Sequence, residues 1–124
     1  MKMKEKPKKI FIFGAGGAGR SAARKLETEF QLLGFIDNDA KKNGSWLGEY
    51  KVYEPGILRS REPDHIFIAS EFSEQILDQL LTVFDISLRK ITILDSREPE
   101  NSRKSMKLVP TTTLKTSHKN KYFI

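Results

Sequence analysis

The 124-residue sequence contains no cysteine. Disulfide frameworks, thiol nucleophiles and cysteine-based metal sites are therefore excluded. The sequence also lacks any apolar run near the ~20 residues that span a bilayer. Its charged first nine residues lack the apolar stretch of a signal peptide. These absences leave a cytoplasmic protein without a transmembrane segment as the expectation.

The net charge of +6 is unevenly distributed along the chain. Residues 1–9 carry five Lys and one Glu, and residues 96–124 carry seven Lys or Arg and two Glu. The segment between these flanks contains ten basic and thirteen acidic residues. Basic flanks bind nucleic acid or anionic membranes only weakly, through charge alone. We therefore expect no specific nucleic-acid partner.

Short apolar runs alternate with helical patterns up to residue 95. The predicted strands are 9–13, 31–36, 50–53, 64–69 and 90–94, and the predicted helices are 18–30, 55–58 and 72–84. This alternation predicts an α/β fold, an open parallel sheet of about five strands with helices on both faces. Residues 40–48 are predicted to form a polar loop. The short strand 50–53 is the expected sheet edge, where self-association into a homo-oligomer is plausible.

The periodic pattern ends after Asp95. Residues 96–124 are rich in Ser, Thr, Lys and Asn, with only isolated apolar spots. We therefore predict a domain at residues 1–95, followed by a basic tail or linker at 96–124.

The segment after the first strand matches G-x-G-x-x-G through Gly14, Gly16 and Gly19. The pattern is weak alone, but here a strand precedes it and a helix follows it, as in Rossmann-type nucleotide-binding domains. Gly14 makes the turn, Gly16 admits a pyrophosphate to the backbone, and Gly19 packs the helix on the strand. Gly17 and Ala18 complete the predicted cofactor-binding turn, where free N–H groups favour a phosphate.

An acidic residue follows the second strand. Asp37 lies 23 residues after Gly14, near the spacing of a ribose-binding acid. A carboxylate there disfavours a 2′-phosphate, so NAD is the candidate cofactor rather than NADP. Asn38 and Asp39 are further candidate contacts, while Lys41 and Lys42 offer an alternative way of binding phosphate.

Purely structural interpretations stand beside these functional ones. The glycines would then provide only a tight turn, and the acids would cap a loop. Ser70 ends the fourth strand, where ligands of open sheets lie, but a helix cap is the simpler role. Trp46 would either stack on a base or fill the loop's own small core.

Catalytic patterns are missing from the sequence. His65 and His118 are too isolated to suggest metal ligands, and no G-x-S-x-G elbow or P-loop is present. Asp37, Asp39 and Glu49 offer at most a weak cation site. We identify no catalytic residue and predict no metal.

Four segments together resemble one group of Rossmann modules. They are IFGAGGAGR at 12–20, LLGFIDNDAKKNGSWLGEYKVYEP at 32–55, DHIFIAS at 64–70 and QILDQL at 75–80. They resemble the N-terminal domain of CapD-like polysaccharide-biosynthesis proteins, which are nucleoside-diphosphate-sugar epimerases and dehydratases. Similar modules precede sugar O-acyltransferases and some methyltransferases. The resemblance implies a nucleotide or nucleotide-sugar ligand and a role in glycan synthesis.

The sequence departs from these relatives in its catalytic half. It has no Tyr-x-x-x-Lys pair and no hexapeptide repeat. The first hypothesis is thus a binding module for NAD or a nucleotide sugar that works with a catalytic partner domain or protein. The second is a small NAD-dependent nucleotide-sugar oxidoreductase or epimerase acting as an oligomer. The third is an S-adenosylmethionine-binding methyltransferase fragment.

Overall fold

The computed structural model describes residues 6–94, so the predicted tail at 96–124 lies outside the described residues. The six strands form one sheet in the order β3-β4-β2-β1-β5-β6. They are β1 (Lys9–Phe13), β2 (Gln31–Ile36), β3 (Trp46–Leu47), β4 (Tyr50–Tyr53), β5 (His65–Ile68) and β6 (Ile91–Ile93). The helices are α1 (Gly17–Leu26) and α2 (Ser73–Thr82), with 3-10 turns η1 (Ala40–Lys42), η2 (Pro55–Arg59) and η3 (Leu88–Lys90). All neighbouring strands pair in parallel except β3 with β4, which confirms the predicted α/β class.

The core has two faces because successive side chains of a strand point to opposite sides of the sheet. Ile10 and Ile12 of β1 pack in one cluster with Ala22 and Ala23 of α1. Phe11 and Phe13, which alternate with them, are equally buried and point to the other face. The continuous apolar sequence of β1 follows from this double coverage.

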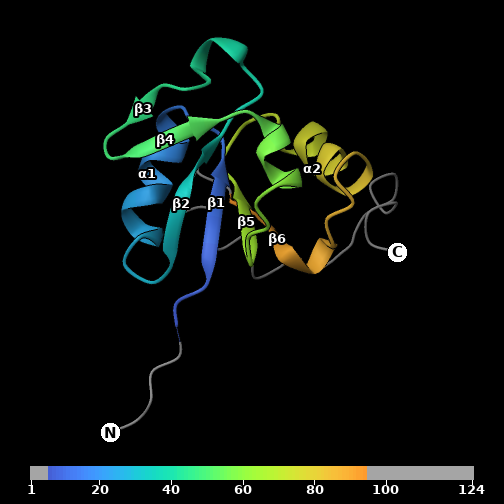
Figure 1. Cartoon of the computed structure of the whole chain (residues 1–124), viewed down its shortest axis with the longest axis horizontal. Helices are drawn as coiled ribbons and strands as arrows, with labels where there is room; N and C mark the ends of the chain where they lie inside the picture. The colour runs from blue at the N-terminus through green and yellow to red at the C-terminus, as the bar shows by residue number, and fades with distance from the viewer. Residues whose placement is uncertain (1–5, 95–124) are drawn as a thin grey trace, which may run out of the picture. The chain divides into compact units, whose positions relative to one another are not determined.

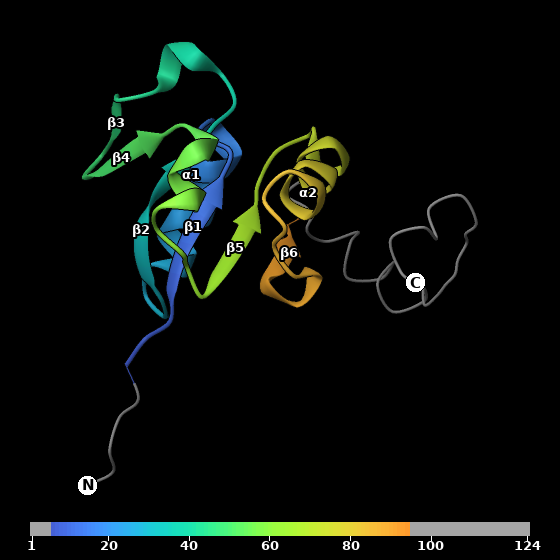
Figure 2. The same cartoon turned by 45° about the vertical axis from the view of Figure 1, so that its right-hand side comes forward.

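Helix α2 covers the face opposite α1, and it buries Ile76, Leu77 and Leu80. Figures 1 and 2 show the two helices on either side of the strands. This arrangement follows from right-handed crossovers, because the chain moves outward in opposite directions from the centre of the sheet. The β1-α1-β2 crossover leads towards β4, whereas β5-α2-β6 leads to the other edge.

The central pair β1 and β5 marks the point where strand order reverses. The chain completes β1, β2 and β4 on one side before it returns to β5 beside β1. Ligands of open α/β sheets bind outside the carboxyl ends of the strands at such a switch point. The glycine turn lies at that position.

Helix α1 is shorter than the predicted helix 18–30. It ends at Leu26, and turns follow up to Phe30. The Thr28 hydroxyl donates to the backbone oxygen of Lys25, and such local bonds compete with regular helix. Phe30 nevertheless packs against the core, with its ring 5.4 Å from that of Phe67.

The predicted polar loop 40–48 is wrong in part, because it contains η1 and β3. Trp46 and Leu47 pair antiparallel with Lys51 and Tyr50. A two-residue connection joins the strands, and its Gly48 has φ +66°, a conformation that tight hairpins demand. The sheet therefore has six strands, and its edge on this side is β3 rather than the predicted 50–53.

Helix α2 is also shorter than the predicted 72–84. Phe72 precedes the helix and is 59% exposed, so it does not belong to the buried stripe. At the other end, Asp85 adopts φ +53°. The N–H of Ile86 then reaches the oxygen of Leu80 at 2.9 Å, which closes the helix C-terminus.

Candidate functional site

The glycine turn leaves β1 at Gly14. Its φ is +128°, and an added Cβ would collide with the backbone oxygen of Ala69 at the end of β5. Its N–H donates to the oxygen of Ile36 at 2.8 Å, which ties the turn to β2. Gly14 is therefore required by the fold itself, and this agrees with the turn-making role expected from the motif.

Gly19 is also required by packing. A Cβ there would collide with the backbone oxygen of Gly14. The first turn of α1 thus lies directly against the end of β1, the close helix–strand contact that the third glycine of the motif allows.

Gly16 and Gly17 differ from these two glycines. Both are exposed, and a Cβ at either position would meet no atom within 4 Å. Gly16 has φ −105°, so its backbone does not need a glycine. No contact among residues 6–94 explains why these positions lack side chains. Open space beside them is what the close approach of a ligand to the backbone would require.

The same segment forms the N-terminus of α1. Gly16 is the N-cap residue, and no side chain caps the helix. The N–H groups of Gly17, Ala18 and Gly19 belong to the first turn, which has no earlier carbonyl partner within the helix. Uncapped N–H groups and the helix dipole together favour an anion at this point.

Asp37 directly supports the glycine turn. Its Oδ2 accepts a hydrogen bond from the Ala15 N–H at 2.8 Å, and its Oδ1 accepts one from the Asp39 N–H at 2.9 Å. The sequence pattern assigned this carboxylate to ribose, and the structure adds a bracing role. Each oxygen retains a further lone pair for a ligand hydroxyl.

Asn38 and Asp39 are both exposed after β2 but make different contacts. The Asn38 amide forms two hydrogen bonds of 3.0 Å with the amide of Gln79, which lies on α2. Asp39 caps η1 by accepting from the Lys41 N–H at 3.0 Å. Sequence reasoning missed Gln79, whose only signal was a polar residue beside the apolar stripe of α2.

Ser70 lies beside the turn but does not cap α2 in the expected way. Its Cβ is 3.5 Å from the point that a Cβ of Gly14 would occupy. Its Oγ accepts from the Phe72 N–H at 3.0 Å, and Phe72 itself is the N-cap. Ser70 therefore shapes the turn that precedes the helix.

The remaining candidates lie elsewhere or are not grouped. His65 begins β5 at the amino-terminal end of the strand, away from the glycine turn, and its Nε2 lies 2.8 Å from the Thr92 Oγ1. Burial, with Lys8 and Lys90 nearby, lowers the pKa of His65. Trp46 is 62% exposed, so it fills no loop core. Within residues 6–94, no three His, Asp or Glu side chains are grouped to hold a metal ion.

The helices of the described part are short. Neither α1 nor α2, at ten residues each, has the length and apolar character needed to cross a membrane.

Comparison with known proteins supports the fold. Residues 6–92 match the family model described as C2185-like, N-terminal. A search of curated proteins finds no match for the chain.

Solved structures with the same fold include a sugar-nucleotide enzyme and a transcriptional repressor. UDP-D-quinovosamine 4-dehydrogenase from Vibrio fischeri is 24% identical with a TM-score of 0.60, and the match covers 78% of this chain and 86% of that one. RSP, a Rex-family repressor, is 15% identical with a TM-score of 0.57, and the match covers 82% of this chain but 58% of that one. The same repressor in complex with β-NAD⁺ and operator DNA also matches at 0.57 and 15% identity, over 82% of this chain and 56% of that one. The chain thus spans little more than half of the repressor's length, and these likenesses establish a Rossmann-like fold.

Proposed function

The chain therefore belongs to the C2185-like, N-terminal family, and we propose that it is a nucleotide-binding domain whose turn at residues 14–19 holds a pyrophosphate. The observation that carries this proposal is the contrast within the motif. The fold requires Gly14 and Gly19, whereas Gly16 and Gly17 border open space at the uncapped start of α1. A ligand phosphate supplies the reason for those two glycines that the protein contacts do not.

NAD is the first candidate ligand. The residues at the switch point fit it: Gly16, Gly17 and Ala18 would hold the pyrophosphate, and the spare lone pairs of Asp37 would accept ribose hydroxyls. The negative charge of Asp37 disfavours a 2′-phosphate, so NAD is expected to bind more tightly than NADP. Bound NAD would supply hydride chemistry. The Rex-family repressor, which has this fold, was crystallised with NAD⁺.

A nucleotide sugar is the second ligand class. The resemblance to CapD-like proteins supports it, as does the fold shared with a UDP-D-quinovosamine dehydrogenase. On this proposal the domain serves polysaccharide or glycan biosynthesis, and a partner domain or protein supplies the catalytic groups. DNA binding, named for the repressor, is not extended to this chain, because acidic residues outnumber basic ones in residues 10–95.

The test is a thermal-shift panel on the full chain, followed by calorimetry. The ligands are NAD⁺, NADH, NADP⁺, a UDP-sugar and S-adenosylmethionine. A ligand at about 100 times its Kd stabilises the folded state by about 2.7 kcal/mol, which gives a clear shift in Tm. Absence of any shift at millimolar concentrations contradicts the proposal, and a shift with S-adenosylmethionine alone selects the methyltransferase interpretation.

Two variants locate the ligand. Gly16→Val is expected to abolish the shift and keep the fold, because its side chain enters open space at an allowed φ. The matched control is Ser21→Val, which places the same side chain at an exposed position of α1 away from its first turn. Equal ligand affinity in both variants would place the ligand elsewhere.

A further inference from the structure

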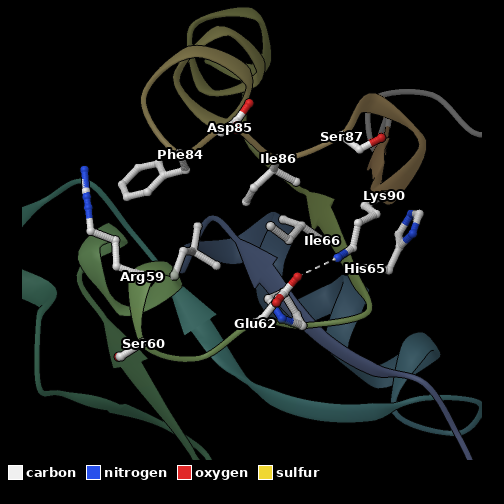
Figure 3. A pocket seen from close by; sticks show the side chains of 12 residues that line it. Arg59, Ser60, Glu62, His65, Ile66, Phe84, Asp85, Ile86, Ser87 and Lys90 are labelled. Atoms are coloured by element: carbon white, nitrogen blue, oxygen red, sulfur yellow. Dashed lines mark hydrogen bonds and ion pairs between the residues drawn. The ribbon is translucent and has the colours of Figure 1, made fainter.

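A cavity lies at the end of the sheet opposite the glycine turn. It has a volume of about 530 Å³ and lies at the amino-terminal ends of β5 and β6 (Figure 3). Its lining comprises Leu58, Arg59, Ser60, Glu62, Pro63, His65, Ile66, Phe84, Asp85, Ile86, Ser87 and Lys90. These residues come from η2 and the loop after it, from the start of β5, and from the connection between α2 and β6. The cavity is therefore separate from the proposed nucleotide site.

Part of the cavity lining is apolar, and polar side chains make up the rest. Leu58, Pro63 and Ile66 are buried, and Phe84 and Ile86 are partly buried around them. Figure 3 shows Ile66 and Ile86 among the side chains that line the cavity. The volume falls within the roughly 300–1,000 Å³ of small-molecule sites, which bury a ligand's apolar surface. A bare ion would leave this apolar surface unused, so the ligand needs an apolar body.

Arg59 supplies a cation at this cavity. Its guanidinium lies over the Phe84 ring, 4.7 Å from the ring centroid. Within residues 6–94, no carboxylate lies within 4.0 Å of it. The ring restrains the side chain and leaves its planar N–H donors available for a carboxylate or phosphate.

The charged side chains that line the cavity are two cations, Arg59 and Lys90, and two anions, Glu62 and Asp85. Lys90 lies 3.3 Å from Glu62, but Glu62 is 81% exposed, and such surface pairs contribute little. Asp85 also lines the cavity, and it is exposed. His65 is partly buried beside Thr92, and burial, followed by the charges of Lys8 and Lys90, lowers its pKa.

We propose that this cavity binds a small amphiphilic anion, with one carboxylate or phosphate on Arg59 and an apolar body over Ile66 and Ile86. The site combines a restrained guanidinium with an apolar patch in a cavity of sufficient volume. It stands independently of nucleotide binding, because the two sites share no residue.

The test uses two-dimensional NMR of the full, ¹⁵N-labelled chain titrated with four probes. Benzoate and phenyl phosphate each combine an aromatic body with one anionic group, and the tighter of the two identifies the preferred head group. We expect saturable shifts at the amides of Ile66, Ile86 and Lys90. Inorganic phosphate lacks the body and benzylamine has the opposite charge, so neither is expected to give saturable shifts there.

Arg59→Gln is expected to weaken the better probe about tenfold, the loss of one charge-assisted contact. The matched control is Arg61→Gln, because Arg61 is exposed two residues further on and does not line the cavity. The proposal is overturned if neither anion binds at millimolar concentration, if benzylamine binds equally well, or if Arg59→Gln binds unchanged. Saturable shifts confined to Gly16, Gly17 and Ala18 would also overturn it, because they would place the anion at the nucleotide turn.

Discussion

The Asp37 carboxylate accepts a hydrogen bond from the backbone N–H of Ala15 at 2.8 Å, so the residue that follows β2 braces the turn that follows β1. Its second oxygen accepts from the Asp39 N–H at 2.9 Å. A single carboxylate thus holds two adjacent loops at the switch point. Asp37 therefore helps to fix the shape of the glycine turn through protein contacts alone.

Replacing Asp37 by Ala is expected to destabilise the fold. The Ala15 and Asp39 N–H groups would each lose a charged acceptor, and leaving such groups unpaired costs about 1–3 kcal/mol. Urea denaturation of the full chain measures the change. Asp78→Ala on the exposed face of α2 is the control, because the Asp78 side chain accepts no hydrogen bond within residues 6–94. Equal stability of the two variants would contradict the bracing role.

The glycines of the turn are expected to respond differently to alanine. Gly14→Ala and Gly19→Ala each place a Cβ against a backbone oxygen and should lower the free energy of unfolding by about 2–4 kcal/mol. Gly17→Ala meets open space at the start of a helix and should be neutral or stabilising by up to ~1 kcal/mol. Denaturation curves test this order. Comparable losses of unfolding free energy in Gly17→Ala and Gly14→Ala would contradict the conclusion that the fold requires Gly14 but not Gly17.

The amide pair of Asn38 and Gln79 links the loop after β2 to α2 through two hydrogen bonds of 3.0 Å. A double-mutant cycle with Asn38→Ala and Gln79→Ala is expected to give a coupling of about 0.5–1 kcal/mol, because the pair is largely exposed to water. Gln75→Ala, one turn earlier on α2 and exposed, is expected to show no coupling with Asn38→Ala. Absence of coupling with Gln79 would mean that the pair does not form in solution.

The pKa of His65 predicts a pH-dependent stability. Burial, together with Lys8 and Lys90, lowers this pKa below its ordinary value of 6.5. The unfolded chain therefore binds more protons than the folded chain between the two pKa values, and stability rises with pH across that window. Lowering the pH from neutral through 6.5 should destabilise the native protein, and the loss should be complete below the folded pKa.

His65→Gln tests whether His65 causes this pH dependence of stability, since glutamine does not titrate. The difference in unfolding free energy between the native chain and the variant should change with pH in that window and level off above it. A difference that stays constant with pH would show that His65 has the same pKa in both states.

Local patterns were enough to predict most of the elements. The apolar runs of β1, β2, β4, β5 and β6 and the alternation with helical stripes led to a parallel sheet, because strands covered on both faces require such runs. The glycine spacing also identified Gly14 as the residue of the turn and Gly19 as the position of close helix–strand packing. Helix ends were less predictable, because Thr28 and Asp85 end regular structure through local bonds that weigh little in a periodicity. The two-residue β3 was too short to show any alternation.

The sequence by itself determined the fold class, the order of the elements other than β3, and the position of the glycine turn, because these depend on local periodicity and on residue types within a few positions. Only the tertiary structure decided which groups meet across the chain. Asp37 accepts a hydrogen bond from Ala15, and Asn38 bonds to Gln79. Arg59 lies over Phe84 at a cavity that no sequence motif predicts. The members of these pairs are 22, 41 and 25 positions apart in the sequence, and they become neighbours because the parallel crossovers bring distant segments side by side. Local sequence patterns do not predict such contacts between distant residues.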